Sequence, residues 1–332
     1  MYARQIYRQA ELQQEMSAAS TELYPARKDL LEKSNLTTAI QIGKYQLRFE
    51  PEDIDDEFFA EKAKNELREC PEIRQQALRE IRVLVANNPD LTVPDDDEFY
   101  EKFLRPCKWY PKSAYEVMER FYKFRLSHRR VCEDLLPSKE RNVFCSGVLT
   151  PLPLRNGDGC RILLIESGKK WKPKEVSLDE MFKATMLSLD AAMAEPRTQV
   201  SGIRAIIDMD GLSLSQVTYF TPSFASMVVE WVQKCLPSRI KGIHVINQPY
   251  VFKMVFAFFK PFLQEKLRKR IIFHGADRES LKAHISANAL PKKYGGELDI
   301  PDEPIGEALW KYFCSFEDDF IVSNKCGYKN KT

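Results

Sequence analysis

Few residues of this 332-residue chain combine the side-chain types and spacings that catalysis requires. The four histidines are His128, His244, His274 and His284, and none forms an H-E-x-x-H pair or another metal-ligating spacing. His244 lies inside the apolar run Ile243–Ile246, where a lone histidine is more often a satisfied core group than a catalyst. Acid–base catalysis would also require a partner within hydrogen-bonding reach, which the sequence does not supply.

Other catalytic and cofactor motifs are missing as well. The sequence contains no G-x-S-x-G elbow, no P-loop and no G-x-G-x-x-G. Gly157 and Gly159 precede an apolar strand-like run, so we interpret them as a turn. Asp208 and Asp210 resemble part of a metal loop, but the remaining EF-hand ligands are absent, and we favour a strand cap. We therefore expect no catalytic residue, no metal and no cofactor, and predict that the protein is not an enzyme.

Residues 250–270, YVFKMVFAFFKPFLQEKLRKR, indicate a different chemistry, the binding of apolar and anionic groups. The apolar side chains near one helical stripe are Phe252, Val255, Phe256, Phe259 and Leu263. The apolar run stops at Lys260-Pro261 after about ten residues, whereas a membrane-spanning helix takes roughly twenty. This segment is therefore either a buried core helix with a solvated basic end or a helix with two alternative apolar environments.

Basic residues gather in and near the same segment. Lys266 and Arg270 are four residues apart and share a helix face, while Arg239 and Lys241 alternate on entering a strand and share a strand face. Together they could hold anionic phosphates, as basic clusters at membranes do, with ordinary solvated surface as the alternative. Nucleic acid is an unfavourable partner, because the net charge is only +2 and the nearby aromatic residues belong to an apolar helix.

The composition is that of a globular protein, with 44% hydrophobic and 30% charged residues. The N-terminal residues lack the apolar core of a signal peptide, so we expect a cytosolic protein. The 8 cysteines are scattered without a C-x-x-C pair, and we expect reduced, mostly buried thiols.

The elements that position these residues form two parts. From Asp55 to about Leu136 the pattern is helical, which predicts a small helical domain at residues 51–145. After Cys145, apolar runs alternate with helical patterns. The predicted strands are Ile162–Ile165, Ile203–Ile207, Ile243–Ile246 and Ile271–Phe273, and the predicted helices are Leu178–Met193, Thr221–Cys235 and Tyr250–Arg270. Strands that are apolar on both faces predict an α/β fold, a mainly parallel sheet covered by helices.

The predicted helices carry more apolar surface than one modest sheet requires. Surplus apolar lining with isolated polar groups such as Thr185 favours a hydrophobic ligand pocket, with a well-filled core as the alternative. Residues 1–50 form a polar extension that we interpret as partly disordered or regulatory. Residues 301–332 form a tail in which a Pro-rich break precedes a short aromatic segment and loose final residues.

Several stretches resemble the CRAL-TRIO lipid-binding family, in the branch that contains the tocopherol and retinaldehyde carriers and the clavesins. The stretches are GIRAIIDMDG (202–211), TPSF (221–224), IKGIHVINQP (240–249), FKPFLQEKLRKRI (259–271), LPKKYGGEL (290–298) and, in the helical part, FLRPCKWYPKSA (103–114). The likeness covers about residues 55–300. It implies a helical N-terminal domain and an α/β domain at residues 146–300 that encloses one hydrophobic ligand. It also implies a mobile helical gate, here residues 247–270.

The resemblance further implies site residues. The pocket positions carried over from the tocopherol carrier are Phe182, Thr185, Leu189, Ile203, Ile207, Trp231, Val232, Leu236, Phe252, Val255 and Phe256. Its phosphoinositide groove is matched by Arg239, Lys241, Lys266 and Arg270. Three positions depart from the pattern: Cys107 replaces a groove arginine between Arg105 and Lys108, Leu189 replaces a serine, and Trp231 replaces a valine. These departures leave open a reduced phosphoinositide affinity and a ligand other than tocopherol.

We therefore expect a monomeric, non-enzymatic lipid-transfer protein that needs no cofactor. It would carry one tocopherol-, retinoid- or phospholipid-like molecule and bind an anionic, phosphoinositide-containing membrane, but no nucleic acid. Its expected place is the cytoplasm and membrane surfaces, with endosomes as one candidate. The alternative is a phosphoinositide-sensing trafficking adaptor of the clavesin type, whose bound lipid is structural or regulatory. An enzyme acting on lipids has the least support, because no nucleophile–base pair was found.

Overall fold

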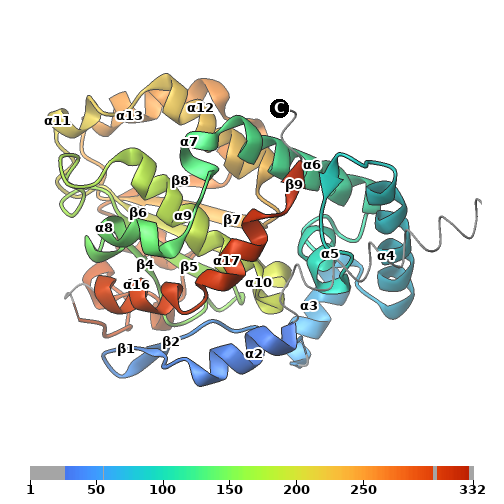
Figure 1. Ribbon diagram of the computed structural model, residues 1–332. Helices are drawn as coiled ribbons and strands as arrows, with labels where there is room; N and C mark the ends of the chain where they lie inside the picture. The colour runs from blue at the N-terminus through green and yellow to red at the C-terminus, as the bar shows by residue number, and fades with distance from the viewer. Residues whose placement is uncertain (1–26, 55, 302–304, 329–332) are drawn as a thin grey trace, which may run out of the picture.

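The computed structural model describes residues 27–54, 56–301 and 305–328. A helical part stands to one side of an α/β part (Figure 1). The helices of the first part and of the connection to the second are α3 (Glu57–Leu67), α4 (Pro71–Ala86), α5 (Asp97–Leu104), α6 (Pro111–Ser127), α7 (Arg129–Cys132) and α8 (Arg141–Cys145). The expectation of a helical N-terminal region is confirmed.

Local sequence signals determine where these helices begin and end. The Asp56 carboxylate accepts a hydrogen bond from the Phe58 N–H and begins α3, and Asp96 caps α5 through the Phe99 N–H, both at 2.9 Å. Arg68 ends α3 in a left-handed conformation, with φ of 65°. These caps set where α3 begins and ends and where α5 begins.

The central sheet has the order β4-β5-β6-β7-β8. Its strands are β4 (Leu149–Pro151), β5 (Arg161–Glu166), β6 (Ile203–Asp208), β7 (Ile240–Ile246) and β8 (Ile271–Gly275). Strands β5 to β8 are parallel, which confirms the predicted sheet, and β4 pairs antiparallel to β5. Sequence analysis missed β4, because three residues are too few to show a period.

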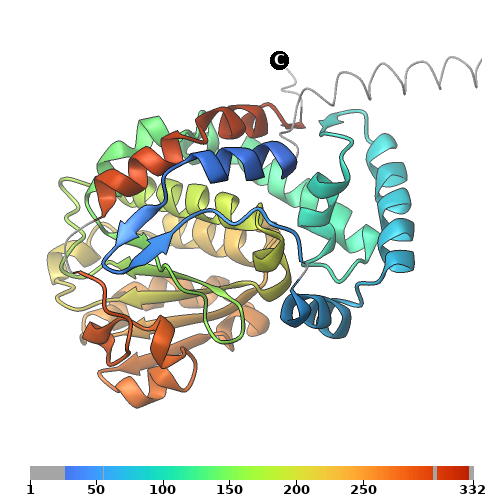
Figure 2. The same ribbon diagram turned by 90° about the horizontal axis from the view of Figure 1, so that it is seen from below.

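The two faces of the sheet lie against different helices. On β6, Ile203, Ala205 and Ile207 alternate toward one face, against α9 (Leu178–Met193), α12 (Pro222–Glu230) and α13 (Phe252–Phe259). Ile206 lies on the other face, in a cluster with residues of α15 (Arg278–Lys282) and of the segment that follows it. Figures 1 and 2 show these layers from two sides. Strands buried on both faces explain the continuous apolar runs of the sequence.

Two of the predicted helices are interrupted. The single helix expected over residues 250–270 is wrong: α13 is followed by a 3₁₀ turn at Lys260–Phe262 and by the short α14 (Glu265–Arg268). Pro261 cannot donate a helical hydrogen bond, and the regular helix ends just before it. The helix expected over residues 221–235 is α12 with a π-helical last turn, Trp231–Cys235.

Segments near both ends of the chain pack against the α/β part. They are α2 (Arg27–Leu36), β1 (Ile40–Ile42), β2 (Tyr45–Leu47), α16 (Gly306–Cys314) and α17 (Glu317–Asn324). The paired short strands β3 (Leu91–Thr92) and β9 (Gly327–Tyr328) pack against the core of the helical part instead. Figure 2 shows α2 beside α17, where Lys33 Nζ lies 2.7 Å from Asp319 Oδ2. Ile40 and Ile42 are buried in the same core as α9. Residues 1–26 of the polar extension and residues 302–304 and 329–332 of the tail lie outside the described residues.

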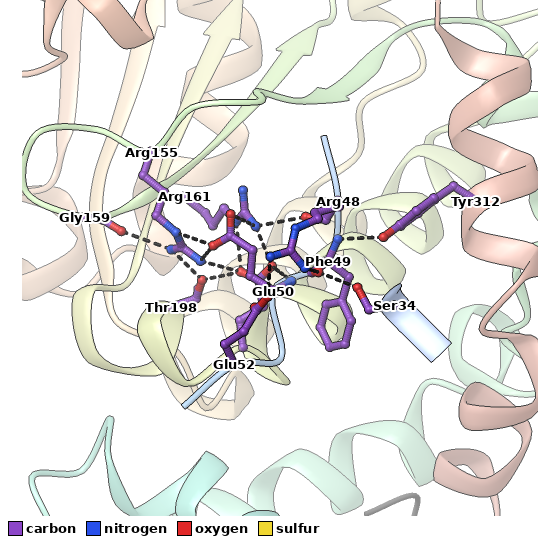
Figure 3. A network of polar contacts seen from close by, with 11 residues as sticks. Ser34, Arg48, Phe49, Glu50, Glu52, Arg155, Gly159, Arg161, Thr198 and Tyr312 are labelled. Carbon is purple, nitrogen blue, oxygen red and sulfur yellow. Dashed lines mark hydrogen bonds and ion pairs between the residues drawn. The ribbon is translucent and has the colours of Figure 1, made fainter. Parts of the chain in front are cut away.

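A buried polar network fastens the N-terminal segment to the sheet (Figure 3). Arg161 Nη2 donates to Glu195 Oε1 at 2.6 Å, and Arg155 Nη2 donates to Glu195 Oε2 at 2.9 Å. Glu50 joins the pair, with its carboxylate 2.8 Å from Arg155 Nη2 and its N–H 3.0 Å from Glu195 Oε1. Burial by itself would raise the pKa of Glu195, but Arg161 and Arg155 lower this pKa to about 2. Glu195 is therefore an ionised group that the neighbouring arginines neutralise.

Three histidines form a cluster: His244 on β7, His274 on β8 and His284 after α15. His244 is fully buried, and its Nδ1 lies 3.0 Å from His274 Nε2, whose ring also contacts the Ser280 hydroxyl at 2.8 Å. The ring of His284 lies 5.2 Å from that of His244. Burial, and then the charge of Arg204, lower the pKa of His244 to about 3.

This cluster makes stability depend on pH. An unfolded histidine binds a proton below a pKa of about 6.5, whereas folded His244 stays neutral to a pKa of about 3. The free energy of unfolding should therefore fall as the pH is lowered from 6.5 towards 3, by up to about 1.4 kcal/mol per pH unit from this group. Denaturant unfolding at several pH values across that range should show that the free energy of unfolding depends less steeply on pH in His244→Gln than in the unaltered protein. The partly exposed His128 provides the control, and equal slopes for His244→Gln and His128→Gln would contradict the prediction.

Candidate functional site

An apolar cavity lies between one face of the sheet and α9, α12 and α13. Its volume is about 260 Å³. Every lining residue on β6, β7, β8 and the three helices has an apolar side chain except Thr185 on α9. The three helices cover this face of the sheet without filling the space against it. The cavity therefore arises from how the helices pack on the sheet, and no single element forms it.

Most of the predicted pocket residues lie together at this cavity. Those that line it are Phe182, Thr185, Leu189, Ile203, Ile207, Trp231, Val232, Phe252, Val255 and Phe256. Leu236 is buried in the surrounding core and does not line the cavity. It leaves the π-helical turn, in which its N–H donates to the Trp231 carbonyl at 2.8 Å, and the chain continues from it towards β7.

Sequence analysis missed several other lining residues. They are Leu163, Ile165, Ser167, Leu178, Met181, Ala205, Met209, Phe220, Phe224, Val228, Val229, Ile240, Ile243, Val245, Phe259, Leu263, Leu267, Ile271 and Phe273. Strand alternation could have found Ala205, which lies between Ile203 and Ile207 on the same face. Residues such as Phe220 and Phe273 come from a loop and an edge strand, and only the tertiary structure places them at the cavity.

The cavity offers two hydroxyl groups and no charged side chain. The Thr185 hydroxyl donates to the Met181 carbonyl of its own helix at 2.8 Å. Ser167, at the end of β5, is buried and has no hydrogen-bond partner within the described ranges. A ligand therefore meets apolar walls and a single available hydroxyl, an environment that suits a largely apolar, uncharged molecule.

The segment over the cavity has two different faces. Phe252 and Val255 of α13 are buried against the cavity, whereas Met254 is 51% exposed and Tyr250 is 81% exposed. Further along the same segment, the large ring of Phe262 is also exposed. Residues 250–262 therefore cover the cavity from one side and present apolar surface to solvent on the other.

A polar anchor holds Asn247, three residues before this segment. Asn247 adopts a left-handed conformation with φ of 52°, and its amide bonds Asp208 Oδ1 and Arg278 Nη2, each at 2.8 Å. Asp208 also accepts the Tyr294 hydroxyl at 2.8 Å and the Asp210 N–H at 2.9 Å. These acidic residues thus cap a strand, and the described part of the chain has no cluster of metal-ligating side chains.

The predicted phosphoinositide residues lie at the junction of the helical and α/β parts, and they fall into two pairs. Arg239 Nη2 and Lys241 Nζ both contact Glu66 Oε2 of α3, at 2.5 Å and 3.1 Å. Lys266 is exposed, and neither its side chain nor that of Arg270 makes a hydrogen bond or ion pair with another described residue. The two pairs meet where β7 and β8 begin, because the Ile243 N–H donates to the Arg270 carbonyl at 2.8 Å.

Arg105 and Lys108, the basic residues that flank Cys107, differ in whether they can reach an outside anion. Arg105 is buried, and its Nη2 lies 3.0 Å from Glu69 Oε1, so it joins helices and is unavailable to an outside anion. Lys108 is exposed, and it follows Cys107 directly. Burial raises the pKa of Cys107 to about 11 against the lowering effect of Arg120 and Lys266, so the Cys107 thiol is neutral.

The polar anchor predicts a measurable contribution to stability. Asn247→Ala removes two hydrogen bonds and places an alanine in the left-handed region, so the free energy of unfolding should fall by about 3 kcal/mol. Asn247→Gly removes the same bonds without the backbone penalty and should be the more stable variant by about 1 kcal/mol. Denaturant titration of the two variants measures both values. Equal stabilities would show that the left-handed backbone is not maintained.

Membrane-spanning helices are not found among the described residues, where no helix has the length and apolarity to cross a bilayer.

Comparison with known proteins identifies the family. Residues 146–296 match the CRAL/TRIO domain. The chain is 36% identical over 261 residues to the human "Alpha-tocopherol transfer protein-like", covering 78% of this chain and 75% of that protein. Human Clavesin-2 is 31% identical over 241 residues, which cover 72% and 73% of the two chains. Mouse Clavesin-1 is 30% identical over 241 residues, which cover 72% and 68%. With this extent of similarity and the matching fold, the chain belongs to the CRAL-TRIO family.

Proposed function

We propose that this protein binds one hydrophobic lipid in the cavity of its α/β domain and transfers it between membranes. The observation that carries the proposal is the apolar cavity itself, because an unfilled space of this size destabilises a core that has no ligand to occupy it. Burying an apolar ligand there contributes about 25 cal/mol per Å² of apolar surface removed from water. The function is binding and transfer, and the protein is not an enzyme. In this proposal residues 51–145 are the helical domain, residues 146–300 are the ligand domain, and the protein acts as a monomer.

The cavity lining favours a neutral ligand over a phospholipid. A phosphate inside the cavity would lose its hydration and meet only the hydroxyls of Ser167 and Thr185. A tocopherol-like or retinoid-like molecule has one weakly polar group, which the unpaired Ser167 hydroxyl can accommodate. The similarity to a protein named for tocopherol transfer agrees with this class.

The segment over the cavity would serve as the gate. It joins an apolar surface, at Tyr250, Met254 and Phe262, to basic side chains at Lys266 and Arg270. At a membrane surface, side chains that leave the cavity can enter the acyl boundary instead of water, and each lysine or arginine near an anionic leaflet contributes roughly 1 kcal/mol. The protein would then move between the cytoplasm and membrane surfaces such as those of endosomes.

A phosphoinositide-sensing trafficking adaptor is the second candidate, and the similarity to the clavesins favours it. In that case the bound lipid would be a structural or regulatory ligand. Measuring exchange of the ligand between two vesicle populations separates the candidates, because an adaptor does not need to move lipid.

Filling the cavity should abolish ligand binding. Ala205 lies on the central strand β6 and lines the cavity, so Ala205→Phe places a ring in the ligand space. Native mass spectrometry with lipid extraction, on protein isolated from its own cells, should detect a bound lipid in the unaltered protein and none in Ala205→Phe. Thermal unfolding should confirm that the variant is folded.

Ala60→Phe on the exposed face of α3 is the matched control and should retain the lipid. A lipid that remains bound to Ala205→Phe at the original stoichiometry would place the ligand elsewhere.

Removing the positive charges of Lys266 and Arg270 should weaken membrane binding. Lys266→Ala combined with Arg270→Ala removes about 2 kcal/mol of attraction to an anionic leaflet, which corresponds to about thirtyfold in affinity. Sedimentation with phosphatidylcholine vesicles that contain phosphatidylinositol bisphosphate measures the loss, and transfer between vesicles should slow as well.

The control is Arg79→Ala combined with Lys174→Ala, which removes two exposed positive charges on other surfaces. If both double variants lose the same affinity, net charge alone explains the binding, and the groove has no part in it.

A further inference from the structure

We call Arg239, Lys241, Lys266 and Arg270 together the basic groove, with Arg239 and Lys241 as its inner pair. The carboxylate of Glu66 already contacts this inner pair. Arg239 Nη2 lies 2.5 Å from Glu66 Oε2, and Lys241 Nζ lies 3.1 Å from the same oxygen. Lys62, one turn earlier on α3, lies 3.7 Å from the other carboxylate oxygen, Oε1. Three cations thus converge on one carboxylate, in the manner of a phosphate-binding site.

The position of Glu66 is set by the fold. Leu67 and Ala63 are buried and fix the last turns of α3 in the helical domain, and the left-handed Arg68 ends the helix. On the opposite side, Arg239 is fixed because its guanidinium also donates to the Val200 carbonyl. The carboxylate is therefore delivered from one domain to cations of the other, and its contact joins the end of α3 to the start of β7.

Glu66 stays ionised at any physiological pH. Partial burial by itself would raise its pKa, but the hydrogen bonds from Arg239 and Lys241 lower this pKa to about 2. Protonation cannot remove the carboxylate from the groove in a cell. A competing anion can do so, because the Glu66 side chain is 37% exposed and is able to turn towards solvent.

Exposure differs between the inner and outer cations. Arg239 is only 14% exposed, its Nη2 contacts Glu66 Oε2, and its Nη1 donates to the Val200 carbonyl. Lys266 is exposed and unpaired within the described residues, and Arg270 is half-buried and close enough to Arg239 for their charges to interact. An incoming headgroup therefore meets Lys266 and Arg270 first and Glu66 second.

We propose that Glu66 is a built-in competitor for the groove, and that a phosphomonoester-bearing lipid headgroup binds fully only by displacing its carboxylate from Arg239 and Lys241. This inference rests on the proposed phosphoinositide binding and deepens it. A phosphomonoester carries about 1.5 to 2 negative charges at neutral pH, against one for the carboxylate, and offers more acceptor oxygens. Displacement also releases the contact between α3 and β7, so occupation of the groove loosens the junction of the two domains.

The test compares Glu66→Gln with Glu61→Gln, which removes the same charge from an exposed position of the same helix that has no ion-pair partner among the described residues. Sedimentation with phosphatidylcholine vesicles containing phosphatidylinositol bisphosphate should show about three- to tenfold tighter binding for Glu66→Gln. The reason is that the partly exposed ion pairs of Glu66 with Arg239 and Lys241 no longer compete with the lipid phosphate. Glu61→Gln should match the unaltered protein. Glu66→Ala serves as a second variant, and thermal unfolding checks that each is folded.

The gain must also depend on the cations that Glu66 occupies. In a Lys241→Ala background, the effect of Glu66→Gln should shrink towards that of Glu61→Gln, which a general change of surface charge would not produce. Equal vesicle affinities for Glu66→Gln and Glu61→Gln would overturn the inference while leaving the loss in Lys266→Ala/Arg270→Ala, and so the proposed membrane binding, intact. If neither the unaltered protein nor Glu66→Gln binds these vesicles better than pure phosphatidylcholine, both proposals fail.

Soluble inositol trisphosphate distinguishes the source of the phosphate. Calorimetric titration should show weaker binding of this headgroup alone than of vesicles, with the same gain in Glu66→Gln. If Glu66→Gln binds the soluble headgroup but not the vesicles, the groove recognises a free phosphate compound, and the assignment to a lipid is overturned.

Discussion

The structure depends on one constraint, the need to cover the apolar face of the sheet that Ile203, Ala205 and Ile207 share with alternate residues of the neighbouring strands. Leaving this face in water would cost about 25 cal/mol per Å² of apolar surface. Helices α9, α12 and α13 cover it, but they approach from different sides and leave a cavity of about 260 Å³. The same packing that excludes water thus creates the space for a ligand. It also gives α13 two roles, because its inner face completes the core while its outer face remains apolar and exposed.

A second interaction, the buried ion network around Glu195, decides where the ends of the chain lie. Separating buried charges from water costs free energy that is regained only when the partners are well placed. Arg155 and Arg161 meet that condition for Glu195, and Glu50 completes the set from the N-terminal segment. The Phe49 N–H then donates to the Tyr312 hydroxyl of α16 at 2.7 Å, so the N-terminal segment also holds the C-terminal helices (Figure 3). Segments outside the matched CRAL/TRIO residues 146–296 are thus fastened to the α/β part, whereas every residue that lines the cavity lies within the matched range.

Positive charge gathers at the junction of the helical and α/β parts, where membrane binding is proposed. Arg239 and Lys241 enter β7 beside the end of α3, and Lys266 and Arg270 follow the segment that covers the cavity. The segment that covers the cavity and the basic residues Lys266 and Arg270 therefore lie on one stretch of chain, residues 247–270. Glu66 of α3 contacts Arg239 and Lys241, so the proposed anion site coincides with a contact between the helical and α/β parts.

Some of this organisation could be predicted from local sequence. Helix Leu178–Met193 has the predicted bounds, and the predicted parallel strands are present, because period and capping are properties of neighbouring residues. Residues such as Phe182 and Ile203 could be expected at the pocket for the same reason, together with the family resemblance. Residues 250–270 were expected as one helix, but Pro261 divides the segment.

What the sequence alone determined is thus the α/β pattern, the apolar character of the pocket faces and the presence of four basic groove positions. Only the tertiary structure decided that Phe273 reaches the cavity, that Leu236 does not line it, and that Glu66 lies between Arg239 and Lys241. Glu66 and Arg239 are 173 residues apart, and no local period or cap relates them. The physical reason is that hydrogen bonding and hydrophobic period act over a few residues, whereas cavities and ion pairs arise where separately formed elements meet.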